Sequence, residues 1–155
     1  MADVLEISES NGAGETVTDG ITNGNFGSTD AANLATATYP IRAGENSYIK
    51  YWRLHWATKD AYTKIDNVKV YQSAGTLSGS DAIEHDADKT FATPVATTLT
   101  GDGALPTELG SAAAITCSLT AVGYSSYCAL QLQVDAATTA GATGITITWV
   151  YDAQA

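Results

Sequence analysis

Most of the side chains that could bind a ligand or a partner lie in one segment. Six of the seven Lys and Arg residues fall within residues 42–69, together with two Trp and three Tyr. Aromatic rings stack on sugars and on other planar groups, and Arg and Lys donate charged hydrogen bonds to carboxylates. Residues 1–41 carry six carboxylates and no cation, and residues 70–155 carry eight carboxylates and one Lys. Recognition chemistry is therefore expected in a charged, aromatic segment of an otherwise acidic chain.

A second set of polar residues could bind a metal. Asp81, Glu84, Asp86 and Asp88 surround His85, and such a density of oxygen ligands is typical of calcium loops. The Asp-x-Asp-x-Asp-Gly spacing and the distal Glu of an EF-hand are missing. We therefore expect a solvated acidic loop here, with no metal and no cofactor.

The two cysteines allow two interpretations. Cys117 and Cys128 both alternate with aliphatic residues, which favours buried thiols. If residues 115–119 and 126–134 form a hairpin around residues 121–125, the two side chains face each other and a cross-strand disulfide becomes possible. Two Cys and two distant His do not match a structural zinc site.

Catalytic motifs are absent from the sequence. It contains no Gly-x-Ser-x-Gly, no His-Glu-x-x-His and no phosphate loop, and nothing favours a carboxylate pair for glycoside hydrolysis. We therefore expect that the protein is not an enzyme. The net charge of −10 repels nucleic acid, and no apolar run approaches the roughly 20 residues of a membrane span. The N-terminus lacks the features of a signal peptide, so synthesis in the cytoplasm is expected, without nucleic-acid or membrane partners.

The elements that must position these residues are β-strands. The chain is rich in Thr, Ala, Gly and Ser, and residues alternate with a period of two in several segments. Strands are expected at residues 4–9, 48–56, 64–71, 115–119, 126–134 and 144–151. Many short strands and one core predict an all-β fold, an antiparallel β-sandwich of jelly-roll-like type.

Alternation in residues 48–56 gives the segment two faces. Trp52, Leu54 and Trp56 share one face, and we expect them to fill the core, with Lys50 reaching the edge. Tyr51, Arg53 and His55 then point outward, where they could contact a partner. The alternative is that Trp52 and Trp56 form an exposed platform for sugars.

The N-terminal region is expected to act as an arm. Residues 1–33 contain many Gly and few apolar residues, so we divide the chain into an arm and loop region (1–33) and a single sandwich domain (34–155). The strand at residues 4–9 is expected to pair with the sheet edge of a neighbouring chain. The candidate partner-binding residues are Val4, Leu5, Ile7, Arg42, Tyr51, Arg53 and His55.

One pattern resembles a known class of proteins. The segment from Ser47 to Gly75 is similar to structural proteins of tailed bacteriophages. In these, a strand of the type Lys-Tyr-x-Arg-Leu-x-Trp/Phe and a short loop precede a second strand of the type Lys-Ile-x-Asn-Val/Ile-Lys-Val/Phe-Tyr/Trp and a turn of small residues. The matching residues are Lys50, Tyr51, Arg53, Leu54, Trp56, Lys64, Ile65, Asn67, Val68, Lys69 and Tyr71. The closing Ile-Thr-Ile-Thr-Trp-x-Tyr-Asp, residues 145–152, resembles the last strand of such proteins.

The resemblance implies a virion structural protein, and the expected type is a capsid decoration (cement) protein. Such a protein would sit on the capsid surface, bind the major capsid protein and form a homotrimer that sums modest contacts. The alternative is a carbohydrate-binding module or a head or tail fibre domain that recognises host glycans. A glycan-active enzyme on the same fold is the third possibility.

Overall fold

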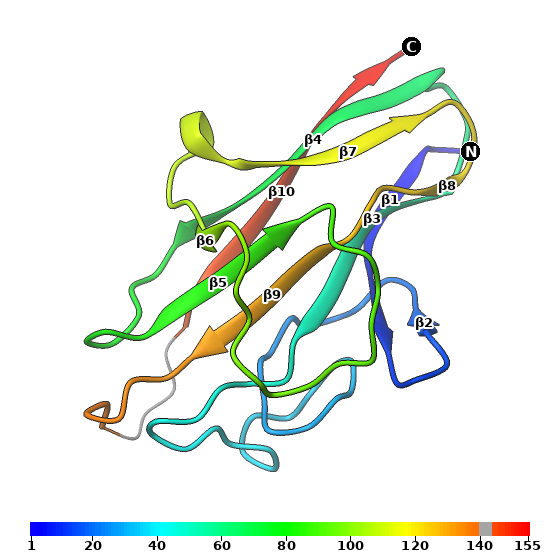
Figure 1. Ribbon diagram of the computed structural model, residues 1–155. Helices are drawn as coiled ribbons and strands as arrows, with labels where there is room; N and C mark the ends of the chain where they lie inside the picture. The colour runs from blue at the N-terminus through cyan, green and yellow to red at the C-terminus, as the bar shows by residue number, and fades with distance from the viewer. Residues whose placement is uncertain (140–143) are drawn as a thin grey trace.

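The computed structural model describes residues 1–139 and 144–155, which form two antiparallel β-sheets with almost no helix (Figure 1). The strands are β1 (Val4–Asn11), β2 (Thr16–Thr18), β3 (Lys50–Thr58), β4 (Lys64–Ala74), β5 (Ala82–Ala87), β6 (Gly103–Ala104), β7 (Ala113–Leu119), β8 (Gly123–Tyr124), β9 (Cys128–Gln133) and β10 (Thr146–Gln154). One short 3-10 helix, Leu109–Ser111, precedes β7. The expectation of an all-β, antiparallel, sandwich-like fold is confirmed.

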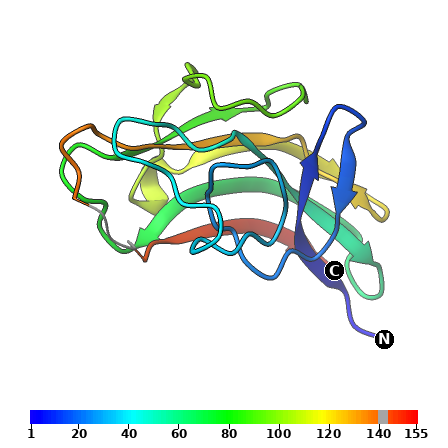
Figure 2. The ribbon, with the colours of Figure 1, turned by 90° about the horizontal axis from the view of Figure 1, so that it is seen from below.

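The strands divide unequally between the two sheets. The larger sheet has the order β2-β1-β3-β9-β5-β6, and β8 also pairs with β3. The smaller sheet has the order β10-β4-β7. The two sheets lie one above the other, and both chain termini lie at the same end of the molecule (Figures 1 and 2). We call the face of the larger sheet that packs on the smaller one its inner face, and the opposite face its outer face.

The main core lies between the sheets. Trp52 and Trp56 on the inner face of β3 are 4% and 0% exposed. They belong to one cluster whose buried members are Phe26, Trp52, Leu54, Trp56, Ile65, Val68, Val70, Ile83, Leu105, Ile115, Cys128 and Leu130. The core interpretation of the two tryptophans is confirmed, and an exposed sugar platform made of them is wrong. Large aromatic side chains bury the most area per residue, which explains their place.

A second, smaller core covers part of the outer face. The loop between β5 and β6 crosses this face in front of β9 in Figure 1. Its Phe91 packs against Tyr51 and Tyr127, with ring centroids 5.0 and 5.9 Å away. Tyr51 is only 2% exposed. The expected outward orientation of Tyr51 is correct, but the side chain is buried because the loop covers it.

The N-terminal strand is an integral part of the larger sheet. Residues of β1 from Val4 to Ser10 pair with β3, and the end of β1 pairs with β2. Leu5 and Ile7 are half-buried against the main core, while Val4 is 43% exposed. Strand β3 of the same chain occupies one edge of β1, and β2 covers the other edge only from Glu9 to Asn11. The expected pairing of residues 4–9 with a neighbouring chain stays a prediction. The boundary at residue 33 stays a prediction.

Two further expectations need correction. The β7 strand belongs to the smaller sheet and β9 to the larger one, so they form no hairpin, and Cys117 and Cys128 are free thiols. The acidic segment 81–88 contains β5 rather than a solvated loop. Its His85 is buried and its ring Nδ1 lies 2.8 Å from the Gly103 carbonyl oxygen. Pairing of β5 with β9 overrides the local preference of acidic residues for loops.

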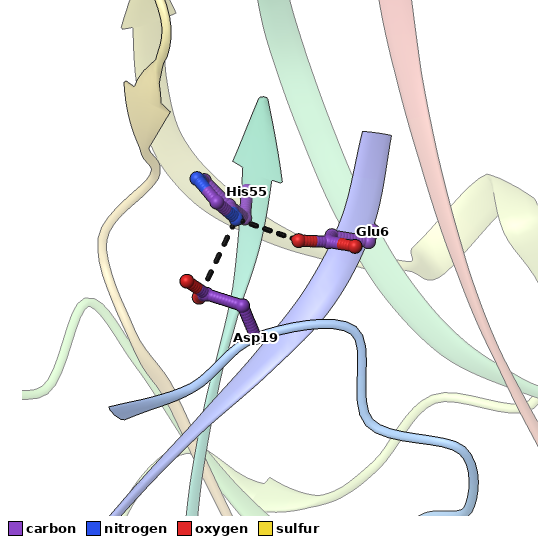
Figure 3. Close-up of side chains that lie close together, drawn as sticks. All are labelled: Glu6, Asp19 and His55. Atoms are coloured by element: carbon purple, nitrogen blue, oxygen red, sulfur yellow. Dashed lines mark hydrogen bonds and ion pairs between the residues drawn. The ribbon is translucent and has the colours of Figure 1, made fainter. Parts of the chain in front are cut away.

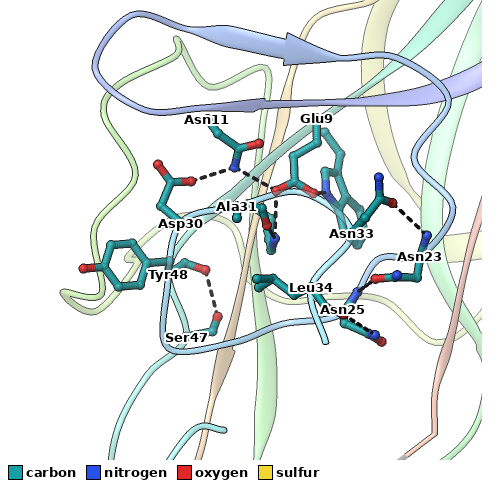
Figure 4. A network of polar contacts seen from close by, with 12 residues as sticks. Glu9, Asn11, Asn23, Asn25, Asp30, Ala31, Asn33, Leu34, Ser47 and Tyr48 are labelled. Atoms are coloured by element: carbon teal, nitrogen blue, oxygen red, sulfur yellow. Dashed lines mark hydrogen bonds and ion pairs between the residues drawn. The ribbon is translucent and has the colours of Figure 1, made fainter. Parts of the chain in front are cut away.

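A buried ion pair fastens the long connection between β2 and β3. Lys50 Nζ donates to Glu9 Oε1 over 2.7 Å and to the Ala31 carbonyl over 2.6 Å. Glu9 also accepts hydrogen bonds from Trp52 Nε1 and from Asn11, whose amide in turn binds Asp30 (Figure 4). Lys50 is 1% exposed, so the expectation that it reaches the sheet edge is wrong. The carboxylate of the neighbouring strand removes the cost of burying its charge.

Candidate functional site

A polar, aromatic surface lies on the outer face where β1, β3 and β8 meet. In the sheet register Glu6 lies opposite His55 and Ser8 lies opposite Arg53. The short strand β8 places Tyr124 opposite His55 on the other side of β3. Because successive side chains of a strand alternate between faces, these residues share the outer face and the core residues between them point inward.

Planar side chains stack along this surface. The His55 and Tyr124 rings are nearly parallel, with centroids 4.2 Å apart. Arg53 Cζ lies 3.9 Å from the Tyr124 ring centroid and 4.4 Å from that of Tyr127. Two planar groups this close to one ring must lie on its opposite sides, so Tyr124 separates His55 from Arg53. We call these four residues the stacked row.

Arg53 lacks an acceptor. Within residues 1–139 and 144–155, its guanidinium takes part in no hydrogen bond and no salt bridge, and its Nε is buried without a partner. The two tyrosine rings hold the group by cation–π contact, which leaves its donors free. A planar guanidinium held in this way is preorganised to bind a carboxylate through two parallel hydrogen bonds.

Two carboxylates, Glu6 and Asp19, lie beside the stacked row, and its side chains change the pKa of Asp19. Loss of hydration raises the pKa of the Asp19 carboxyl, but hydrogen bonds from Ser8 and Tyr124 lower it. Electrostatic interaction with the His55 and Arg53 side chains lowers it further, so the pKa of Asp19 lies below its ordinary value. Asp19 is thus a carboxylate at neutral pH. The surface therefore offers one free cationic group beside fixed negative charge, a pattern that suits recognition of another charged surface.

A large apolar groove opens on the inner side of the fold. Its volume is about 1050 Å³. Residues of β1, β3 and β10 and of the connection from β2 to β3 line it. Ile7, Trp52, Ile147 and Trp149 line it, and the buried Trp149 Nε1 has no acceptor in the described part of the chain. Arg42 is exposed at the rim of this groove, on a different face from Arg53.

The structure separates the predicted partner-binding residues into groups. Arg53 and His55 come together in the stacked row, Tyr51 is buried beside it, and Arg42 lies at the groove. Leu5 and Ile7 point toward the core and Val4 lies at the start of β1.

Four residues of the site, Glu6, Asp19, Tyr124 and Tyr127, were not singled out from the sequence. Glu6 lies beside the stacked row because β1 pairs with β3. Asp19 lies there because a turn at Gly20 brings it back to His55. Gly20 has a left-handed φ of +58°, a conformation that glycine adopts readily in tight turns. Tyr124 lies in the segment expected to be a hairpin turn. No local pattern shows that these residues meet.

The thiols, the strongest nucleophiles of the chain by type, lie outside this surface. Burial raises the pKa of Cys128 far above its usual range and also raises the pKa of Cys117. Both therefore stay protonated at neutral pH, which suppresses covalent chemistry. The stacked row contains neither thiol, and we treat it as a candidate binding surface.

Within residues 1–139 and 144–155, no helix has the length and apolar character that a membrane span requires.

Comparisons of the chain with protein-family models, with curated proteins and with solved structures gave no match.

Proposed function

We propose that the protein is a non-enzymatic virion structural protein of the capsid-decoration type, which binds the major capsid protein through the stacked row. The observation that carries the proposal is the free guanidinium of Arg53, held between Tyr124 and Tyr127. Arg and Tyr are the residue types that dominate binding energy at protein interfaces. The Lys-Tyr-x-Arg-Leu-x-Trp pattern of phage structural proteins contains this same Arg53.

The acidic character of the chain supports this proposal. A net charge of −10 on a 155-residue chain keeps the free protein soluble and steers it toward basic patches. Arg53 takes a carboxylate of the capsid surface, and the surrounding Glu6 and Asp19 favour basic groups at the rim. The proposal includes a homotrimer on the virion surface, in which the contacts of three protomers add together. It also includes a jelly-roll type for the two-sheet fold.

The test is co-sedimentation of the purified protein with expanded and unexpanded capsids of its source. Arg53→Ala should weaken binding by at least about thirtyfold, which corresponds to the roughly 2 kcal/mol of an interface hot spot. Arg53→Lys should also weaken it, because an ammonium group cannot form the bidentate, stacked contact. Lys69→Ala, which removes a cation from the smaller sheet, is the matched control and should bind normally.

The same variants distinguish the proposal from the glycan-binding alternative. A glycan array probed with the intact chain should show no specific signal. Specific glycan binding that Arg53→Ala abolishes, with no binding to capsids, would replace the decoration function with host recognition. Equal capsid binding by Arg53→Ala and the intact protein would remove the stacked row from the interface.

A further inference from the structure

Three side chains from distant parts of the chain converge beside the stacked row (Figure 3). They are Glu6 of β1, His55 of β3 and Asp19 of the connection that follows β2. One ligand atom from each lies within 4.8 Å of the others. His55 Nδ1 is 2.9 Å from Glu6 Oε1 and 3.4 Å from Asp19 Oδ1. We propose that these three side chains form a binding site for a divalent transition metal ion such as Zn²⁺.

The spacing of the ligand atoms fits such an ion. Zn²⁺ binds nitrogen and oxygen ligands at about 2.0–2.2 Å. Ligands at that distance are separated by about 3.4 Å in a tetrahedral site and by about 3.0 Å between octahedral neighbours. The two distances from His55 Nδ1 match these values. The Glu6 and Asp19 oxygens lie within 4.8 Å of each other, so the two carboxylates need only approach to about 3.0–3.4 Å for an ion to bind all three ligands.

The ligand types select the class of ion. One imidazole with two carboxylates suits Zn²⁺ and its neighbours in the first transition row, whereas Ca²⁺ and Mg²⁺ prefer sites made only of oxygen. Two carboxylates and a neutral His balance the charge of the ion. Three protein ligands also leave at least one position for water or for a group of a partner.

The surroundings fix the ligands in place. Asp19 accepts hydrogen bonds from the Ser8 hydroxyl over 2.6 Å and from the Tyr124 hydroxyl over 3.1 Å. The Tyr124 ring stacks on His55 and sets the plane of the imidazole. Groups that orient ligands in this way are a regular feature of metal sites. The Tyr124 ring also lies between His55 and Arg53. The ring therefore separates the positive charge of the guanidinium from the three metal ligands.

The backbone shows why the third ligand can approach. Gly20, directly after Asp19, has a left-handed φ of +58°. A Cβ at this position would lie 2.7 Å from Glu6 Oε2. Glycine adopts this conformation without strain and leaves room for the Glu6 carboxylate, so the turn that delivers Asp19 closes directly onto Glu6.

The experiment measures metal binding to the full chain. The protein carries Cys117→Ser, so that the half-buried thiol cannot bind metal, and is freed of metal with a chelator. Calorimetric titration with zinc chloride should show one equivalent bound, and calcium and magnesium chlorides should show no binding at the same concentrations. Cobalt chloride should give the visible absorption of a Co²⁺ ion with nitrogen and oxygen ligands.

Variants localise the signal. Glu6→Gln, Asp19→Asn and His55→Gln should each weaken zinc affinity by more than about a hundredfold, while Tyr124→Phe, which keeps the ring and loses one hydroxyl, should weaken it by about ten- to a hundredfold. Asp135→Asn, a carboxylate change elsewhere, is the control. Thermal melts in chelator verify that each variant is folded.

The proposal is independent of capsid binding and has clear opposing outcomes. No saturable binding of zinc or cobalt to the folded protein would show that His55 and the two carboxylates form only an ion pair. Binding that survives in all three ligand variants would place the metal elsewhere on the chain. Either result overturns the site without affecting the proposed role of Arg53.

Discussion

Two cations on the same strand have opposite environments. Lys50 at the start of β3 points inward and has a carboxylate, a carbonyl oxygen and almost no contact with solvent. Arg53, three residues later, points outward and has two aromatic rings but no acceptor in the described part of the chain. A charge that is fully satisfied inside the protein can contribute only to the fold. A charge that is held rigidly with its donors free can contribute to binding.

The largest effect is expected from removing the strand that satisfies Lys50. Deletion of residues 1–12 takes away β1 and with it Glu9, so Lys50 loses its counter-charge and β3 loses a neighbour. We expect a chain that no longer unfolds cooperatively, measured by circular dichroism and urea titration. A deletion variant with a normal melting temperature would show that β1 is a detachable arm after all.

Removal of Lys50 alone should come next. Lys50→Ala leaves Glu9 buried without its counter-charge, and loss of one partner from a buried pair costs about 3–5 kcal/mol. Urea unfolding measures this change. The double variant Lys50→Met with Glu9→Gln removes both buried charges and keeps one carbonyl acceptor, enough for the Trp52 indole, so it should recover part of the stability. A double variant as unstable as Lys50→Ala would mean that charge pairing is not what stabilises this end of the sheet.

Arg53 should behave in the opposite way. Arg53→Ala removes only cation–π contacts with Tyr124 and Tyr127, so the free energy of unfolding should fall by about 0.5–2 kcal/mol. Capsid binding should fall by at least about thirtyfold, as proposed above, while the variant stays folded. A loss of stability as large as that of Lys50→Ala would place Arg53 in the scaffold and erase the contrast between the two cations.

The smallest effect tests a carboxylate that is satisfied but not buried. Partial loss of hydration raises the pKa of Asp3, but hydrogen bonds from the N–H groups of Asp60, Tyr62, Ala61 and the Trp56 indole lower it below its ordinary value. A depressed pKa adds stability above about pH 4, the range of an unfolded Asp, and this stability disappears as the pH falls through the folded-state pKa.

Asp3→Asn should therefore lower the melting temperature slightly at pH 7, and the difference from the intact protein should vanish at low pH. Asp152→Asn near the exposed C-terminus is the matched control, since its side chain has one amide partner only. A difference that persists unchanged at low pH would show that the charge of Asp3 is not involved.

Local patterns in the sequence predicted much of the fold. Alternation of apolar and polar residues identified β1, β3, β4, β7, β9 and β10 to within a few residues, and it placed Trp52, Leu54 and Trp56 on the core face. Alternation is a local property, because successive side chains of any strand point to opposite faces. The same property made Arg53 and His55 neighbours on the outer face.

Other features depended on contacts between distant segments. Strand β5 was missed because its acidic residues favour a loop until β9 provides a partner. Tyr51 was correctly oriented, yet its burial depends on Phe91, which lies far along the chain. Lys50 was assigned to an edge because no local signal shows that β1 pairs with β3. That pairing places Glu9 opposite Trp52, within reach of the Lys50 ammonium group.

The sequence by itself determined an acidic all-β protein with six of its seven Lys and Arg residues, and two of its three Trp, in one segment, residues 42–69. Only the tertiary structure decided which of those cations is buried with a counter-charge and which remains free. It also decided that Glu6, Asp19 and His55 meet. The physical reason is that a strand sets the direction of its side chains locally, whereas the neighbours of each side chain depend on sheet pairing and on loops that return from elsewhere in the chain.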